Sequence, residues 1–366
     1  MKKIRIMYVM GGIMDKAGAP TVAMRYLRQL AKNDSFEFSV LVHGDGRGYY
    51  DEEIENLGIP IYHAPVRGKH PLRYSSEVRK ILKNHPVDMV HCHMDSSCGY
   101  FLEIAKKQHI RGRIAHSHTT NYQAKRGIKR LIGFVSKKKI HTVATLRLAC
   151  SEAAGKWLYG KDSFHIMNNA IDLKQYSPQE EIREKVRDDL HISPDVVLIG
   201  NFGRLCYEKN QSFLLDVLKE CKKNDTKAKL IIAGTGELSQ KLEEYAVALQ
   251  VRDDVFFLGQ RDDVPDLLQA IDCFAMPSLF EGLPVAGIEA QAAGIPCLFS
   301  DRITPEICMT AGACLLPIDH PQKWADAILH ISKDRNAGDA QRELRKNGYD
   351  IAEESERLAR LYFSSC

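Results

Sequence analysis

The stretch FEGLPVAGIEAQAAGIP, Phe280–Pro296, places Glu281 and Glu289 eight positions apart around a Gly-Leu-Pro step. Pro284 predicts the first turn of a helix, because its fixed φ suits a helix and its missing N–H would have no partner there. The free N–H groups of that turn can bind an anion, and the helix dipole strengthens the site. Glu281 then precedes the helix, and Glu289 lies one to two turns inside it. Carboxylates accept hydrogen bonds from hydroxyls and amides hold a diphosphate, so the stretch suits a sugar nucleotide; an ordinary amphipathic helix with solvated glutamates is the alternative.

Short apolar runs alternate with helical patterns along the whole chain. Helices are expected at Thr21–Ala31 and Ser75–Lys83, among others. This alternation predicts α/β architecture with parallel, doubly wound sheets. The expected strands are Ile4–Met10, Phe36–His43, Ile59–Ala64, Met89–His93, Ile114–His118 and Arg147–Cys150 in a first series, followed from Val196 on by VVLIGNFGR, LIIAGTG, VFFLGQ, CFAMPS and PCLFS.

The chain has 366 residues, which is more than one hydrophobic core usually accommodates, so two domains are expected. We place a Rossmann-like domain at 1–168, an irregular polar hinge at 169–194, and a second Rossmann-like domain at 195–348. The amphipathic segment 349–366 is expected to form a helix that packs back on the first domain. Ligands of such sheets bind beyond the carboxyl ends of the strands, so we expect the two domains to face each other across a cleft.

The composition is that of a soluble globular protein, with 44% apolar and 27% charged residues. The ten cysteines form no Cys-x-x-Cys pair, which indicates reduced thiols rather than a disulfide framework or a zinc site. The opening MKKIRIMYVMGG leads into a strand pattern and is not typical of an export signal. No segment has the roughly 20 apolar residues of a membrane span. We therefore expect a cytoplasmic protein.

Positive charge is concentrated in the first half of the chain. Residues 1–170 carry 28 Lys+Arg against 14 Asp+Glu, and residues 101–150 alone carry twelve against one. Such a patch suggests phospholipid, a lipid diphosphate or nucleic acid as partner, and a solvated helix face is the alternative. Because an apolar strip runs between the cations, we favour a helix at about 127–138 that lies on the inner face of the cell membrane, and no nucleic-acid partner. If the strip packs into the domain instead, the cations simply face water. The cations are Lys125, Arg126, Lys129, Arg130, Lys137, Lys138 and Lys139, and the strip is Ile128, Leu131, Ile132, Phe134 and Val135.

Two loops after expected strands suit phosphate. GGIMDKAGAP, residues 11–20, has three glycines that permit close backbone approach, but neither a dinucleotide fingerprint nor a Walker lysine. NFGRLCYEKN supplies Arg204 and Lys209, which can clamp a diphosphate through one bidentate contact and one point charge. Ordinary surface cations are the simpler explanation of that pair taken alone.

Two histidine pairs occupy positions i and i+2 of expected strands. His116 and His118 share one face of a strand in AHSHTTNY, and the pattern recurs as HCH at 91–93. Neither pair has identifiable carboxylate or cysteine companions, so no metal site is predicted. We expect one histidine of the His116–His118 pair to face the cleft at the end of its strand. The histidines of HCH are expected to lie in the core or to form hydrogen bonds.

Together these motifs resemble the retaining GT-B glycosyltransferases of glycosyltransferase family four, in the branch of bacterial exopolysaccharide and capsule synthesis. The resemblance covers nearly the whole chain: the Gly-rich first loop, HSHT, NNAID, GRLCYEKN, AGTGE, FLGQRDDV and the Glu-x7-Glu stretch. One departure is that Asn169 is followed by Ala170 where the family usually has glycine. An alanine kept at positive φ there would cost roughly 1 kcal/mol.

The resemblance implies a role for each matching residue. Arg204 and Lys209 would bind the donor diphosphate. Glu289 would bind the ribose, Glu281 would hold the donor sugar, and His118 would contact the sugar or its phosphate. Backbone groups around Arg261 would read the base, and Gly12 would approach the phosphates. The domain at 1–168 would bind the acceptor and the domain at 195–348 the nucleotide sugar, and no single acceptor-binding residue is assigned. The implied catalytic residues are His118, Arg204, Lys209 and Glu281, and the implied donor-binding residues are Gly12, Gly234, Arg261, Gly282, Leu283, Pro284, Val285 and Glu289.

No Asp-x-Asp motif occurs, so we expect no metal and no other cofactor, and the cations must stabilise the departing diphosphate. The family implies retention through same-face departure and attack, a donor with uridine rather than guanosine, and a lipid-linked or saccharide acceptor. Two rival interpretations stay open. One is a sugar-nucleotide epimerase of the same two-lobed shape, which needs acid/base carboxylates in the cleft. The other is a non-enzymatic two-lobed binding protein.

Overall fold

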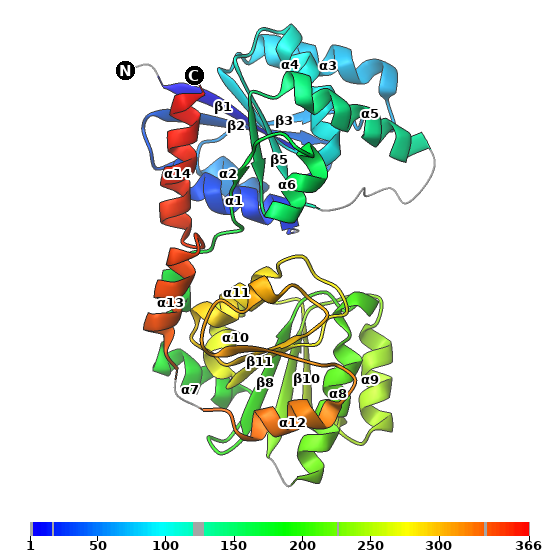
Figure 1. The fold of residues 1–366 in the computed structure, drawn as a ribbon, viewed down its shortest axis with the longest axis vertical. Helices are drawn as coiled ribbons and strands as arrows, with labels where there is room; N and C mark the ends of the chain where they lie inside the picture. The colour runs from blue at the N-terminus through cyan, green and yellow to red at the C-terminus, as the bar shows by residue number, and fades with distance from the viewer. Residues whose placement is uncertain (1–2, 17, 120–127, 225–226, 333–334, 366) are drawn as a thin grey trace. The chain divides into compact units, whose positions relative to one another are not determined.

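The structure is a computed structural model that describes residues 3–16, 18–119, 128–224, 227–332 and 335–365. The chain divides into two compact units, each built on one parallel β-sheet (Figure 1). Unit 1 comprises residues 1–171 and 350–366, and unit 2 comprises residues 172–349. The expected pair of Rossmann-like, doubly wound sheets is therefore confirmed.

The sheet of unit 1 has the order β3-β2-β1-β4-β5-β6-β7, and its named strands pair in parallel. Its interior strand β1 is buried on both faces, with Ile6 and Tyr8 in one hydrophobic cluster and Met7 and Val9 in another. A parallel strand covered by helices on both sides requires such a nearly continuous apolar run. The strands are β1 (Ile4–Met10), β2 (Phe36–His43), β3 (Ile61–Ala64), β4 (Met89–His93), β5 (Gly112–Ser117), β6 (Leu146–Ala149) and β7 (His165–Ile166).

Helices cover both faces of this sheet. Leu27 and Leu358 lie in the cluster on one face, and Val78 and Phe101 lie in the cluster on the other. The helices are α1 (Gly18–Leu30), α2 (Asp51–Asn56), α3 (Pro71–Asn84), α4 (Cys98–Lys107), α5 (Ile128–Val143), α6 (Glu152–Tyr159) and α14 (Ile351–Ser364), with a 3-10 turn η1 (Asp95–Ser97) between β4 and α4.

The sheet of unit 2 has the order β10-β9-β8-β11-β12-β13, again with parallel pairs. Its core includes the fully buried Trp324, whose ring meets that of Phe213 edge-on at 5.5 Å. The strands are β8 (Val197–Phe202), β9 (Ala228–Ala233), β10 (Val255–Gly259), β11 (Cys273–Met276), β12 (Cys297–Ser300) and β13 (Ala313–Leu316). The helices are α7 (Glu180–Asp189), α8 (Gln211–Lys223), α9 (Ser239–Ala248), α10 (Val264–Ala270), α11 (Val285–Ala292), α12 (Pro321–Leu329) and α13 (Ala337–Lys346).

The sequence suggested a hinge at 169–194; residues 169–171 of it lie in unit 1 and residues 172–194 lie in unit 2. Helix α7 is fixed there by two arginines, because Arg183 and Arg187 both reach the buried carboxylate of Asp272. Arg187 also donates to the carbonyl of Val196, 2.9 Å away. An arginine that satisfies a buried carboxylate and several carbonyls holds its helix firmly, so this charged segment belongs to a folded body.

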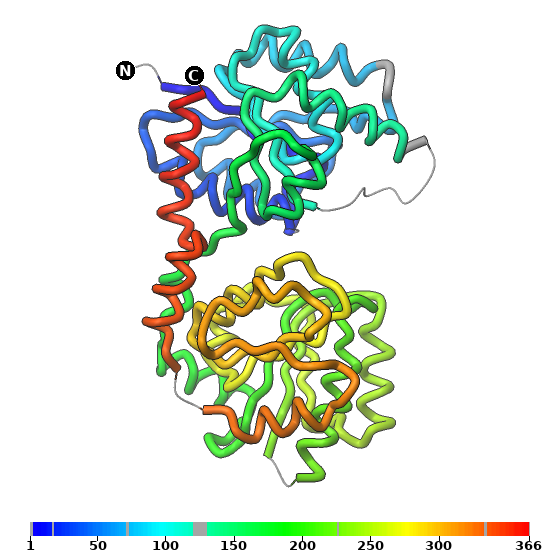
Figure 2. Tube along the Cα trace, viewed as in Figure 1, coloured from blue at the N-terminus to red at the C-terminus, as the bar shows by residue number. Residues whose placement is uncertain are grey.

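The chain returns to unit 1 through α14, which packs against α1, so that the two ends of the colour ramp lie side by side (Figure 2). At the crossing, Ile351 donates its N–H to the carbonyl of Ile171 at 3.0 Å. Ala170 beside it is fully buried and does not have the positive φ that a glycine would allow. Alanine at residue 170, where the family usually has glycine, therefore causes no backbone strain.

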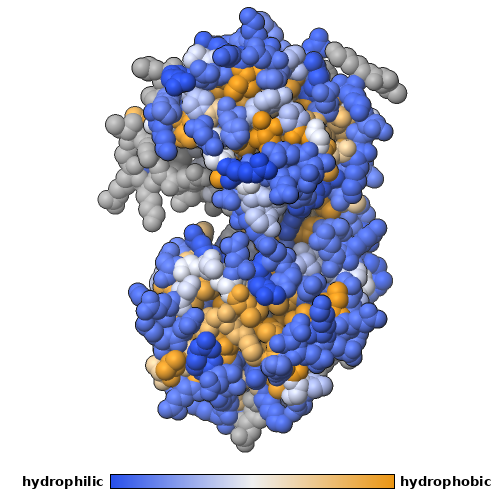
Figure 3. Space-filling view, turned by 180° about the vertical axis from the view of Figure 1, so that it is seen from behind, coloured by the Kyte–Doolittle hydropathy of each residue, from blue (hydrophilic) through white to orange (hydrophobic). Residues whose placement is uncertain are grey.

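Polar and charged side chains cover most of the face of the molecule that Figure 3 shows, with apolar side chains gathered in separate patches. None of the helices in the described ranges combines the length and the apolar composition needed to cross a bilayer.

Candidate active site

Loops after β8, β9 and β10 contact one another at the carboxyl edge of the unit 2 sheet. Gly234, predicted to bind the donor, has φ 145° and donates its N–H to the carbonyl of Gly259 at 2.7 Å. A Cβ at residue 234 would lie 1.9 Å from the carbonyl oxygen of Gly203, so only glycine fits. This close approach holds Gly234 directly beside the β8–α8 loop, which carries both predicted cations.

The β8–α8 loop is joined to the loop before α11 by an ion pair. Lys209 Nζ contacts Glu281 Oε1, and the hydroxyl of Ser278 donates to the same oxygen at 3.1 Å. The two charged side chains are only 22% and 16% exposed. A backbone bond from Leu279 N to Glu208 O, 2.8 Å long, fixes the two loops in register. The structure thus brings together two of the residues predicted to be catalytic.

Helix α11 begins at Val285, one residue after Pro284, which is its N-cap. The helix therefore starts one position later than the proline indicated. Pro284 contributes no side-chain cap, and Gly282 and Leu283 lie in the preceding loop. The amides of the first turn are consequently not occupied by a capping side chain of the N-cap residue, as an anion site requires.

Glu289 lies just over one turn inside α11, as predicted, and is 9% exposed. The same helix is anchored by Gln291, which donates to the carbonyl of Ile307 at 2.8 Å and accepts from the N–H of Met309 at 2.9 Å. Because these hydrogen bonds of Gln291 hold α11 in place, the packing of the helix fixes the position of Glu289.

The two predicted arginines have different surroundings. Arg204 is exposed on the β8–α8 loop, and its backbone carbonyl accepts from Gln211 Nε2 at 3.0 Å. Arg261, after β10, forms an ion pair with Asp263, with Nε 2.7 Å from Oδ1. The guanidinium of Arg261 therefore has a carboxylate partner in its own loop, which agrees with a role for the backbone rather than the side chain there.

His118 and Gly12 belong to unit 1 and are described within it. His118 follows β5 and is partly exposed. Its backbone N–H donates to Asp95 Oδ1 at 2.6 Å, and its ring Nε2 lies 2.9 Å from Nδ1 of His93. Desolvation lowers the pKa of His118 to about 4, so its ring is neutral at pH 7. Gly12 follows β1, and a Cβ there would meet nothing within 4 Å, so a ligand could approach its backbone closely.

The sequence did not reveal that the two histidine pairs lie together. The register of β4 and β5 pairs Cys92 with Ala115, so HCH and HSH become neighbours. His91 and His93 stack at 4.2 Å between ring centroids, as do His116 and His118. A hydrogen bond of 3.1 Å joins His91 Nε2 and His116 Nδ1. HCH is thus a buried, hydrogen-bonding pair; the signal that could have found the larger cluster was two identical His-x-His patterns on adjacent strands.

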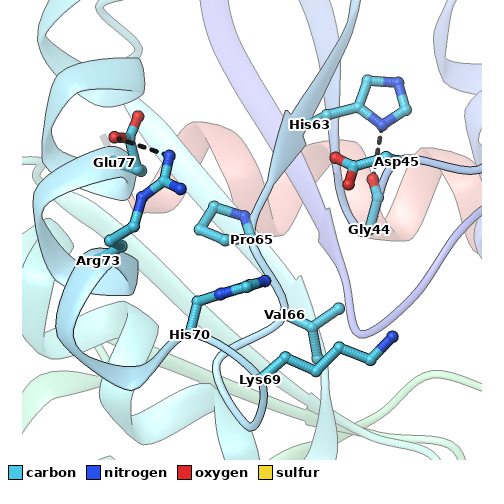
Figure 4. A pocket seen from close by; sticks show the side chains of 9 residues that line it. All are labelled: Gly44, Asp45, His63, Pro65, Val66, Lys69, His70, Arg73 and Glu77. Atoms are coloured by element: carbon cyan, nitrogen blue, oxygen red, sulfur yellow. Dashed lines mark hydrogen bonds and ion pairs between the residues drawn. The ribbon is translucent and has the colours of Figure 1, made fainter.

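Unit 1 also has a polar pocket of about 330 Å³ beside the ends of β2 and β3 (Figure 4). The side chain of Arg73 points to Glu77, 3.8 Å away, and His63 bonds the carbonyl of Gly44 at 2.7 Å. Lys69 and His70 add further donors, so the lining suits a polar ligand rather than an apolar one.

Two Rossmann-like units, each built on one parallel sheet, define the GT-B class of fold. Residues 17–175 match the family described as Glycosyltransferase Family 4, and residues 182–351 match Glycosyl transferases group 1. The chain belongs to glycosyltransferase family four and is a GT-B glycosyltransferase of bacterial polysaccharide biosynthesis.

Individual relatives agree with this assignment. EpsF of Bacillus subtilis (strain 168), a glycosyltransferase by name, is 33% identical over 98% of this chain and 96% of its own. The UDP-Gal:alpha-D-GlcNAc-diphosphoundecaprenol alpha-1,3-galactosyltransferase of Escherichia coli is 24% identical over 91% and 90%. The solved structure of Anabaena HepE in complex with UDP has a TM-score of 0.80 at 19% identity, with full coverage of both chains, and HepE has also been solved with UDP-glucose.

Proposed function

We propose that this protein transfers a sugar from a UDP-sugar, with retention of anomeric configuration, to a lipid-linked or saccharide acceptor in the synthesis of exopolysaccharide or another cell-surface glycan. Relatives support the choice of substrates: one is named for UDP-galactose and a diphosphoundecaprenol acceptor, and the fold is shared with a protein solved with UDP and with UDP-glucose. Retention rests on the resemblance to the family.

The contact between Lys209 and Glu281 carries the proposal. A donor diphosphate offers Lys209 a stronger anion than one carboxylate, and this exchange frees Glu281 to accept hydrogen bonds from the donor sugar. Arg204 on the same loop and the first-turn amides of α11 supply further positive potential. These groups stabilise the negative charge that grows on the nucleotide diphosphate as the sugar leaves.

The rival epimerase needs acid and base carboxylates at the reacting carbon, whereas the carboxyl edge of the unit 2 sheet has Glu281 paired with Lys209. In a binding protein without activity, this ion pair would have no catalytic role. The remaining candidate donor residues, Gly12, Arg261 and Glu289, fit the backbone and ribose contacts proposed for them.

A donor panel tests the function. The purified protein is incubated with UDP- and GDP-sugars and a diphosphate-lipid acceptor, and nucleotide release is measured. We expect UDP release from one UDP-sugar, and an α-linked product from an α-linked donor in the NMR spectrum. An inverted product would overturn retention, an epimerised donor would support the rival enzyme, and binding without any turnover would support the binding protein.

We also propose that α5 places unit 1 on an anionic membrane surface. Leu131, Phe134 and Val135 are 62%, 45% and 40% exposed, so the described part of the strip does not pack into the domain. The inward face of the helix is made instead by residues such as Ser136 and Ile140, which are buried. An exposed apolar strip flanked by cations is the pattern of an interfacial helix.

The cations differ in their availability. Lys138 is exposed, with Nζ 4.6 Å from the centre of the Phe134 ring. Lys139 instead forms an ion pair with Glu103, and Lys137 lies over the ring of Trp157 at 4.9 Å. Lys125, Arg126 and the side chains of Ile128 and Lys129 lie outside the described residues.

Vesicle co-sedimentation tests this surface. Each cation near an anionic leaflet contributes about 1 kcal/mol, screened by salt. Binding should therefore need anionic lipid, disappear at high salt and weaken in a Leu131→Ser/Phe134→Ser variant. The matched control is Val247→Ser, at an apolar residue of α9 that is 61% exposed. Equal sedimentation with neutral vesicles, or none with either, would remove the proposal.

A further inference from the structure

Four imidazoles lie together at the carboxyl ends of β4 and β5, and the proposed transfer reaction uses only His118. We propose that His91, His93 and His116 bind one divalent transition-metal ion through their ring nitrogens. This inference concerns unit 1 alone and does not rest on the proposed function.

The ring nitrogens are close enough for a shared ion. One nitrogen from each of His91, His93 and His116 lies within 4.8 Å of the others, and all three side chains are buried. Zinc–nitrogen bonds of 2.0–2.1 Å place tetrahedral ligand atoms about 3.4 Å apart, so modest side-chain rotations close the site.

Two ring nitrogens of this cluster have no hydrogen-bond partner within the described structure. They are His93 Nε2 and His116 Nε2, and both are buried. Whichever tautomer these rings adopt, each leaves a buried lone pair or N–H unsatisfied, which costs free energy. A metal ion accepts both lone pairs and removes that cost.

Two rings of the site have their other nitrogen held as in known metal sites. His93 Nδ1 lies 2.9 Å from His118 Nε2. His91 Nδ1 in turn lies 2.7 Å from the hydroxyl of Tyr362. A metal-binding histidine usually donates its other N–H to such a partner, which fixes its tautomer and ring orientation.

The ligand set selects the class of metal. Neutral imidazoles suit zinc, copper, nickel or cobalt, and magnesium or calcium would need oxygen ligands. Cys92 belongs to the cluster on the opposite face of the sheet, so no thiolate contributes. The nearest carboxylate of known contact is Asp95, through the backbone of His118.

The full-length protein, treated with chelator and dialysed, is titrated with Co²⁺ alone, and then with Zn²⁺ as competitor. We expect one equivalent of Co²⁺ with the visible absorption of a nitrogen-ligated ion, and its displacement by one equivalent of Zn²⁺. His93→Asn and His116→Asn keep a side-chain N–H donor but remove the Nε2 ligand, and each should weaken affinity at least about tenfold.

The matched control is His165→Ala, an exposed histidine of the same unit, which should bind as the unchanged protein does. Thermal melts establish that each variant is folded. Absence of saturable one-to-one binding, or equal affinity in the His93→Asn/His116→Asn double variant, would overturn the proposal. In that case an ordered water between the two nitrogens is the remaining occupant.

Discussion

Lys209 and Glu281 each neutralise the other's charge at the edge of the second sheet. Neither residue stands out in its own stretch of sequence, because a lysine near a turn and a glutamate before a helix are ordinary surface residues. The contact becomes informative through position: it joins the loops of two adjacent strands, β8 and β11, at the edge where ligands of such sheets bind.

Replacing Lys209 by alanine should lower turnover more than donor affinity, because the diphosphate charge grows in the transition state. We expect kcat to fall roughly a hundredfold to a thousandfold. Arg204→Ala should act in the same direction. Lys219→Ala, at an exposed lysine of α8, is the control and should leave kcat unchanged.

Chelation completes this prediction: activity should survive EDTA, because the cations alone hold the diphosphate. Loss on chelation with recovery on magnesium or manganese would contradict the cation clamp. Recovery on zinc alone would instead implicate the histidine cluster of unit 1.

Glu289→Ala should weaken the binding of UDP about tenfold to a hundredfold, because hydrogen bonds from ribose hydroxyls to a carboxylate contribute roughly 1.5–3 kcal/mol. Calorimetric titration measures this change. Glu243→Ala, on the exposed side of α9, should bind UDP normally. Unchanged affinity together with a lower melting temperature would assign Glu289 to the packing of α11 instead.

At the scale of elements, the sequence predicts strands well where they are central. The runs in β1, β2 and β4 are long and apolar because helices cover both of their faces. Edge strands β7 and β13 were not predicted, since β7 has only two residues and β13 has no fully buried residue. The histidine cluster was missed for a different reason: it depends on the register of β4 and β5, and register is not visible in either strand alone.

His43 at the end of β2 joins three elements and should make unit 1 sensitive to acid. Its Nδ1 lies 2.6 Å from the carbonyl of Met10 in β1, and its Nε2 lies 3.1 Å from the hydroxyl of Tyr74 in α3. Desolvation lowers the pKa of His43, so below about pH 6.5 the unfolded chain binds a proton that the folded chain resists. Its contribution to stability is thus complete above that pH and is lost as pH falls.

The measurement is the free energy of unfolding from urea titrations between pH 5 and 8, for the unchanged protein and for His43→Gln. The difference between the two should shrink towards low pH, by at most about 1.4 kcal/mol per pH unit for one group. Titrations of other histidines cancel in this difference. A difference that is constant with pH would show that His43 does not resist protonation in the folded chain.

At the scale of the whole molecule, the two units should differ in their ability to fold alone. Unit 2 is continuous from 172 to 349 and has its own core around Trp324, so the excised segment should fold and bind UDP. Residues 1–171 alone lack α14, whose Leu358 and Tyr362 are buried in the core of unit 1. They should therefore melt at a much lower temperature, or not fold.

A second variant makes this prediction sharp. Ile171 and Ile351 are hydrogen-bonded neighbours, so a flexible linker of about six residues between 171 and 350 can replace unit 2. This linked form should recover cooperative melting in circular dichroism. If residues 1–171 alone melt as cooperatively as the linked form, α14 is dispensable and the division of the chain is wrong.

The closure of unit 1 by α14 also sets an order of events during synthesis. The hydroxyl of Tyr8 bonds that of Tyr362, a partner 354 residues later in the chain. At 5–20 residues per second, a ribosome needs roughly 20 to 70 seconds to make the second tyrosine after the first. Unit 2 is fully synthesised in that interval, while β1 and α1 still lack their cover. Unit 2 can therefore fold before unit 1 is complete. The apolar strand β1 is the segment that ribosome-associated chaperones would need to shield in that interval.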